Sequence, residues 1–125
     1  MRSSKDFVRY ALSIGAIELV PDGRKLKSGR ISPYFFNSGL FNTGVAIAEL
    51  AKAYASPIVN QLVRPSVLFG PYYKGSAIAI ATAMRIGGAI GYAYDRKETK
   101  DHGERGDIIG ASLDRKFVAL LDDVM

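Results

Sequence analysis

The chain has 125 residues, of which 48% are hydrophobic, and this size and composition fit one globular domain. It contains no cysteine and a single histidine, His102, which excludes disulfides and thiolate chemistry and argues against a histidine-rich metal site. The net charge of +5 predicts an anionic partner, and because basic runs with interleaved aromatics are missing, a phosphorylated small molecule is favoured over nucleic acid.

Neither a membrane segment nor a leader is predicted. No stretch approaches the roughly 20 uninterrupted apolar residues that a membrane-spanning helix needs. The first residues, Met1 to Asp6, are charged, but no long apolar block follows them, so we read no signal peptide. We therefore expect a soluble, cytoplasmic chain with neither nucleic acid nor membrane as a partner.

The first third of the chain predicts a helix, a basic segment of turns and a strand. Apolar residues recur at helical spacing from Phe7 to Ile14, and Gly15 would end that helix. Residues 21–33 mix glycine, serine, proline and four basic residues, which predicts turns around a short strand in an exposed flap. The aromatic run at 34–36 predicts a strand.

The remainder alternates between helices and short apolar strands. A helix is expected over residues 44–63, and Pro57 should kink or split it. Further elements are expected as strand, helix, strand and strand at 66–70, 75–86, 89–94 and 116–121. Uninterrupted apolar strands such as 117–121 are typical of a parallel sheet flanked by helices, so the predicted fold class is α/β.

Ligands of open parallel sheets bind at the carboxyl ends of the strands, which directs attention to three segments. At residues 69–75 a strand turns through glycine and proline into a helix, so Lys74 and the helix N-terminus could form a phosphate pocket. An ordinary turn, with Lys74 in solvent and the tyrosines Tyr72 and Tyr73 packing, is an equally good interpretation.

The second segment is an acidic pair, Asp122 and Asp123, which follows the last apolar strand. Such carboxylates can accept hydrogen bonds from ribose hydroxyls, bind a hard cation through water or stabilise positive charge on a sugar ring. Taken alone, the pair slightly favours a structural turn.

The third segment, residues 96–107, contains no large apolar side chain. With Gly103 and Gly106 to bend it, this stretch is either a solvated surface loop or a mobile lid that carries bases to a leaving pyrophosphate. A fourth candidate is the flap at 26–37, where bases lie beside flat aromatics suited to a planar anion, although Phe35 and Phe36 could simply be core residues.

Read together, these segments closely resemble orotate phosphoribosyltransferases of the bacterial and fungal type, members of the type I phosphoribosyltransferase family. The motifs that carry the resemblance occur in the same order, at 26–30, 32–37, 39–44, 69–71, 73–75, 96–98, 100–104 and 121–124. The resemblance spans nearly the whole chain. It implies a single partial domain, with an N-terminal helix and orotate-binding flap or hood at 1–45 and the first part of the α/β core at 46–125.

The resemblance also implies roles for individual residues. Lys27 would contact phosphoribosyl pyrophosphate, the pair Phe35 and Phe36 would lie against orotate, and Tyr73 with Lys74 would hold the pyrophosphate. The other implied substrate-binding residues are Arg96, Lys97, Lys100 and His102 on the catalytic loop and Asp122, Asp123, Val124 and Met125 in the phosphoribosyl pyrophosphate motif. Lys100, His102, Asp122 and Asp123 would be the catalytic residues.

The implied reaction joins orotate to the anomeric carbon of phosphoribosyl pyrophosphate and yields orotidine 5'-monophosphate and pyrophosphate, a step of UMP biosynthesis. Mg²⁺ would arrive on the pyrophosphate rather than on direct protein ligands. The family also implies a homodimer whose catalytic loop closes over the neighbouring subunit. Because the chain stops inside the phosphoribosyl pyrophosphate motif, we expect the 125 residues alone to be poorly stable and incomplete for catalysis.

Two other functions stay open at this point. One is a phosphoribosyltransferase for another base, or a relative that kept the fold without catalysis. The other is a small basic RNA-binding module, although no nucleic-acid motif is present.

Overall fold

The computed structural model describes residues 4–97 and 107–124. Contacts between residues divide the chain into two compact units, Met1–Ala46 and Ile47–Met125. No helix among the described residues is long and apolar enough to cross a membrane.

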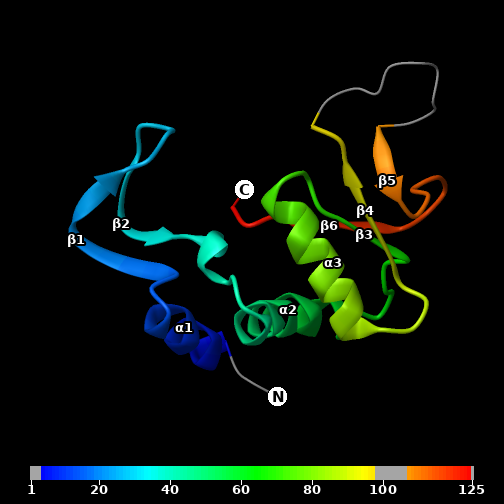
Figure 1. Cartoon of the computed structure of the whole chain (residues 1–125), viewed down its shortest axis with the longest axis horizontal. Helices are drawn as coiled ribbons and strands as arrows, with labels where there is room; N and C mark the ends of the chain where they lie inside the picture. Colours follow the sequence, from blue (N-terminus) through cyan, green and yellow to red (C-terminus); the bar gives the residue numbers. More distant parts are fainter. Residues whose placement is uncertain (1–3, 98–106, 125) are drawn as a thin grey trace. The chain divides into compact units, whose positions relative to one another are not determined.

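The first unit contains a helix, a two-stranded hairpin and a short 3-10 helix (Figure 1). Its elements are α1 (Ser4–Ser13), β1 (Ile17–Lys25), β2 (Ile31–Phe36), η1 (Ser38–Leu40) and the first turn of α2 (Gly44–Val59). The helix predicted from the apolar spacing of residues 7–14 and the strand predicted at 34–36 are confirmed.

An aromatic cluster forms the core of this unit. Phe41 is only 4% exposed, and its ring lies 5.8 Å from Phe7, 6.3 Å from Tyr10 and 6.1 Å from Phe36, measured between centroids. Rings at these separations stabilise a core by more than the area that they bury. The cluster therefore joins α1, the end of β2 and the segment after η1.

The hairpin agrees only in part with the prediction of turns around a short strand at 21–33, because a turn does form at residues 27–29 but the strand before it is longer than expected. β1 already begins at Ile17, runs antiparallel to β2 and loses its regular register between Leu19 and Arg24. Pro21 and Gly23 suggested turns, but both lie in this irregular stretch, where a proline without an N–H and a glycine at φ +83° are tolerated. The irregular pairing is a property of both strands together, so local composition did not reveal it.

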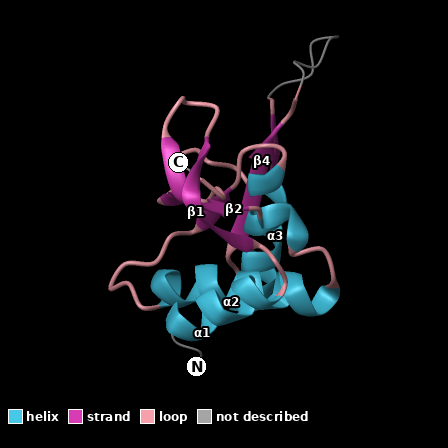
Figure 2. Ribbon diagram, turned by 90° about the vertical axis from the view of Figure 1, so that its left-hand side faces the viewer, coloured by secondary structure: helices cyan, strands magenta, loops and turns pink. Residues whose placement is uncertain are grey.

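The second unit contains the rest of α2 and a four-stranded sheet with a further helix packed on it (Figure 2). Its strands and helix are β3 (Val67–Phe69), α3 (Lys74–Ile86), β4 (Gly91–Asp95), β5 (Ile108–Gly110) and β6 (Val118–Leu120). They lie in the order β5-β4-β3-β6, with α3 against β3 and β4. The predicted alternation of strand and helix is confirmed, and Leu68 and Ala93, both 0% exposed, lie in the core.

The sheet is mixed rather than wholly parallel. β3 is parallel to β4 and β6, whereas β5 is antiparallel to β4 at the sheet edge. β5 was not predicted because its three residues contain only two large apolar side chains. The Arg96 N–H donates to the Asp107 carbonyl at 2.8 Å, so the charged segment begins and ends at paired backbone.

α2 is shorter than predicted and is not split. The helix passes through Pro57 and ends at Val59 instead of residue 63. Leu62 and Val63 are 104% and 68% exposed, so no buried surface stabilises a longer helix.

Candidate functional site

Three chain segments meet at the carboxyl edge of the parallel strands. The Gly70 N–H donates to the Ala93 carbonyl at 3.0 Å, and the Leu121 N–H donates to the Phe69 carbonyl at 2.8 Å. Because β3, β4 and β6 point the same way, the residues that follow them lie at one edge of the sheet. This edge of the sheet is where the sequence predicted a ligand.

The turn from β3 into α3 depends on two glycines. A Cβ at Gly70 would lie 1.8 Å from the Gly75 carbonyl oxygen, and a Cβ at Gly75 would lie 3.0 Å from the Leu121 carbonyl oxygen. Both positions therefore need the close backbone approach that only glycine permits. The approach sets the N-terminus of α3, at Lys74, beside the end of β6.

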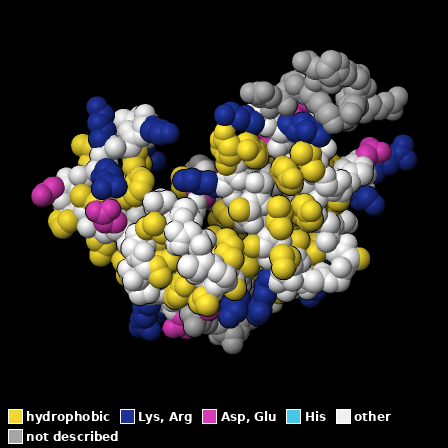
Figure 3. All heavy atoms as spheres, viewed as in Figure 1, with side chains coloured by type: hydrophobic (Ala, Val, Ile, Leu, Met, Phe, Trp, Pro, Cys, Tyr) yellow, Lys and Arg dark blue, Asp and Glu magenta, His cyan; other side chains and the backbone are white. Residues whose placement is uncertain are grey.

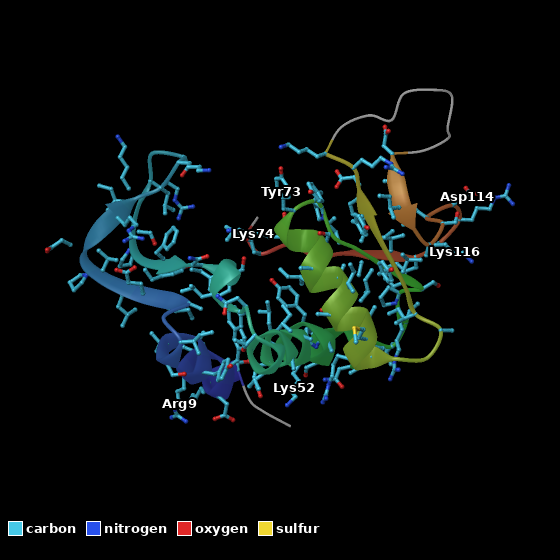
Figure 4. All side chains as sticks on the ribbon, viewed as in Figure 1. Arg9, Lys52, Tyr73, Lys74, Asp114 and Lys116 are labelled. Carbon is cyan, nitrogen blue, oxygen red and sulfur yellow. The ribbon has the colours of Figure 1, made fainter. Side chains whose placement is uncertain are left out.

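An open pocket of about 540 Å³ lies at this edge, lined by Pro71, Tyr72, Tyr73, Lys74, Asp122 and Asp123. The Lys74 ammonium is 3.7 Å from Asp123 Oδ2. The Lys74 side chain is 56% exposed and that of Asp123 is 18% exposed, so the lysine has room to reach an incoming ligand. Figure 4 labels Tyr73 and Lys74 at the first turn of α3, where the partial positive charge of the helix dipole adds to that of the ammonium.

Each acid of the pair is held by the backbone that follows it. Asp122 Oδ1 accepts the Asp123 N–H at 2.9 Å, and Asp123 Oδ1 accepts the Val124 N–H at 2.9 Å. The Tyr54 hydroxyl, from α2, donates to the Asp122 carbonyl at 2.6 Å. Tyr54 was not singled out from the sequence, since an isolated tyrosine in a helix, 68 positions from its partner, has no local signal.

The pKa of Tyr54 is raised above its usual value of 10.0, chiefly by burial and then by the negative charges of Asp123 and Asp122. Since the pKa in the folded chain exceeds that in the unfolded chain, Tyr54 stabilises the fold fully below about pH 10 and loses this contribution as the pH rises through the raised pKa. We expect the alkaline titration of tyrosine absorbance in Tyr54→Phe to lack one component of the unaltered chain, the ionisation of a phenol with a midpoint above pH 10.0. A missing component with a midpoint at or below pH 10.0 would contradict this assignment.

The two tyrosines of the turn contact the last residue of β4 and a residue that follows it. The Tyr72 N–H donates to Asp95 Oδ1 at 2.8 Å, and the Lys97 ammonium lies 5.4 Å from the centroid of the Tyr73 ring. The peptide bond between Tyr72 and Tyr73 is cis. Asp95 is a second residue that sequence reasoning missed. Its position at the end of a strand was the available signal.

Arg96 and Lys97 begin the charged segment beside this turn. Lys97 is exposed, whereas Arg96 is half-buried and its buried Nε has no hydrogen-bond partner among the described residues. The predicted residues Lys100, His102 and Met125 lie outside the described residues.

The flap residues belong to the first unit. Lys27 is exposed between β1 and β2, and basic side chains gather around this end of the hairpin (Figure 3). Arg24 covers the Phe35 ring, with its guanidinium carbon 4.7 Å from the centroid, and Phe36 packs on Phe41. Phe36 therefore contributes to the core of the first unit, while Phe35 stacks under a cation.

No group of three or more His, Cys, Asp or Glu side chains that could hold a metal occurs in the described part of the chain. Asp122 and Asp123 nevertheless offer carboxylate oxygens, the donors that hard cations such as Mg²⁺ prefer. The pocket therefore fits a cation that arrives with an anionic ligand.

No family model matches the chain, but individual proteins do. The orotate phosphoribosyltransferase of Yarrowia lipolytica is 48% identical over an alignment of 128 positions, gaps included, that covers 97% of this chain and 58% of that protein. That of Halorhodospira halophila is 44% identical over an alignment of 126 positions that covers 97% of this chain and 57% of that protein. The chain thus spans somewhat more than half the length of these relatives.

Solved structures support the same relationship. The orotate phosphoribosyltransferase of Francisella tularensis matches with a TM-score of 0.77 and 43% identity over 96% of this chain and 57% of that one. The adenine phosphoribosyltransferase of Leishmania tarentolae, 14% identical, matches with a TM-score of 0.57 over 100% of this chain and 63% of that one, which is a likeness of fold. The expected α/β fold of the type I phosphoribosyltransferases is confirmed.

Proposed function

We propose that this chain, which corresponds over nearly its whole length to part of an orotate phosphoribosyltransferase, belongs to an enzyme that transfers the phosphoribosyl group of phosphoribosyl pyrophosphate to orotate, and that the 125 residues by themselves are incomplete for this reaction. The products are orotidine 5'-monophosphate and pyrophosphate. The observation that carries the proposal is the pocket in which Lys74, at a helix N-terminus, faces Asp123 across 3.7 Å.

The pocket supplies the two kinds of charge that the ligand needs. Lys74 and the N-terminus of α3 attract the pyrophosphate, which is the most negative part of phosphoribosyl pyrophosphate. Asp122 and Asp123 accept hydrogen bonds from the ribose hydroxyls and stabilise the positive charge that develops on the ribose ring as the bond to pyrophosphate breaks. When pyrophosphate arrives, Lys74 exchanges its carboxylate partner for a phosphate oxygen.

Orotate is already an anion, so the reaction needs no strong base from the protein. The residues position the two substrates and neutralise the leaving group, and this accounts for much of the rate enhancement in such reactions. Mg²⁺ bound to pyrophosphate would add positive charge to the leaving group. Lys97, beside Tyr73, adds a further cation on the β4 side of the pocket.

The proposal includes the residues outside this pocket. In the first unit, Lys27 contacts phosphoribosyl pyrophosphate. The rings of Phe35 and Phe36 lie against orotate. Lys100 and His102 complete the catalytic loop, which acts across a homodimer. Arg96, half-buried at the start of this loop, contributes a further cation for the pyrophosphate.

The proposal is tested by pyrophosphate release from magnesium phosphoribosyl pyrophosphate in the intact protein. We expect release that depends on orotate and does not occur with uracil, adenine or hypoxanthine. Release with one of those bases instead would make the protein a phosphoribosyltransferase for that base. If no base supports release while RNA binds with a steep salt dependence, the enzymatic proposal is wrong.

A further inference from the structure

The Tyr54 hydroxyl contacts a single peptide group that separates the two acids of the pocket. This peptide consists of the Asp122 carbonyl and the Asp123 N–H. Its oxygen accepts the Tyr54 hydroxyl at 2.6 Å, and its N–H donates to Asp122 Oδ1 at 2.9 Å. Both polar ends of the peptide are therefore satisfied, one from α2 and one from the acid itself.

The orientation of this peptide controls both carboxylates. The carboxylate of Asp122 accepts the N–H of this peptide. The carboxylate of Asp123, on the other side of the peptide, accepts the Val124 N–H with Oδ1 and faces Lys74 with Oδ2. A rotation of the peptide would withdraw the N–H from Asp122 and change the direction in which Asp123 leaves the backbone. The bond from Tyr54 opposes that rotation, because turning the peptide would leave a part-buried carbonyl without its donor.

The tyrosine suits this position chemically. A phenol is a strong donor and is protonated at neutral pH, and burial together with the neighbouring carboxylates raises the pKa of Tyr54 further. It therefore holds the acidic pair without adding a negative charge beside it. Phenylalanine would fill the same space but could not donate.

We propose that Tyr54 is a positioning residue for phosphoribosyl pyrophosphate, which acts through the Asp122–Asp123 peptide. This inference rests on the proposed function. Loss of the hydrogen bond from Tyr54 would turn the two carboxylates away from the ribose hydroxyls and would not affect binding of the orotate base. In Tyr54→Phe we therefore expect kcat/KM for phosphoribosyl pyrophosphate to fall about tenfold, while KM for orotate stays within about twofold.

The experiment measures initial rates of orotidine 5'-monophosphate formation in the intact protein, with each substrate varied in turn. Tyr92→Phe is the matched control, because it removes the same hydroxyl from an exposed tyrosine of β4 outside the pocket. Tyr54→4-aminophenylalanine, which keeps a donor at the same place, should restore most of the lost activity. If Tyr54→Phe does not fold, Tyr54→4-methylphenylalanine replaces it as a donor-free side chain of similar volume.

A double-mutant cycle separates positioning from general stability. In an Asp123→Asn background, removal of the Tyr54 hydroxyl should have much less effect on kcat/KM for phosphoribosyl pyrophosphate, because the acid that it directs is already altered. An unchanged kcat/KM in Tyr54→Phe, or an equal loss in both backgrounds, would overturn the inference. If the unaltered protein itself forms no orotidine 5'-monophosphate, the proposed function fails instead.

Discussion

Replacement of Lys74 by alanine is expected to weaken binding of magnesium phosphoribosyl pyrophosphate by about 10- to 100-fold, because a hydrogen bond to a charged group contributes about 1.5–3 kcal/mol. The Lys74 side chain is 56% exposed, and its contact with Asp123 is 3.7 Å long, so loss of this ion pair should change the free energy of unfolding by less than about 1 kcal/mol. Calorimetric titration and chemical denaturation of the same preparation measure the two effects separately.

Lys116→Ala is the matched control. It removes the same charge from an exposed lysine of the second unit that does not line the pocket (Figure 4). Its affinity should equal that of the unaltered protein. If the two variants bind equally well, the ligand does not contact Lys74, and the location of the pyrophosphate site is wrong.

The second large effect is expected from Gly70→Ala. The added Cβ would lie 1.8 Å from the Gly75 carbonyl oxygen and 2.9 Å from the Ala79 Cβ, so the turn into α3 has to move. A clash with backbone cannot be relieved by rotating a side chain. We therefore expect the free energy of unfolding, measured with urea, to fall by about 3 kcal/mol.

Gly44→Ala provides the comparison, because it adds the same methyl group at the first residue of α2, where the new Cβ would meet no atom within 4 Å apart from its chain neighbours and the local backbone of the helix. That variant should be neutral or gain up to about 1 kcal/mol, since alanine loses less backbone entropy than glycine in a helix. Equal stability of the two variants would mean that the close approach of Gly70 and Gly75 does not constrain the turn.

Much of the fold could be predicted from the chain alone, because helices and buried strands leave a periodic pattern among neighbouring residues. The apolar spacing from Phe7 to Ile14 predicted α1, and the change from an apolar strand to Gly70 and Pro71 predicted the turn into α3. The acidic pair was recognised for the same reason, since polar residues directly after a buried strand occupy its carboxyl end. The resemblance to a family then assigned a chemistry to these positions.

The irregular parts of the fold depended on pairing between distant segments. The interruption of the hairpin between Leu19 and Arg24 exists only because β1 and β2 meet, so the composition of residues 21–33 could not reveal it. β5 is too short to have a pattern of its own and forms by pairing with β4.

By itself, then, the sequence determined most of the helices and the buried parallel strands and which polar residues follow those strands, because these features depend on local order along the chain. Only the tertiary structure decided which of these residues meet. The order of the strands brings Asp123 within 3.7 Å of Lys74, and the packing of the second unit brings the Tyr54 hydroxyl within 2.6 Å of the Asp122 carbonyl. The physical reason is that hydrogen bonds and ion pairs depend on distance in space. The residues around Tyr54 and around Asp122, which are 68 positions apart in the chain, have no local pattern that reveals how close the two come.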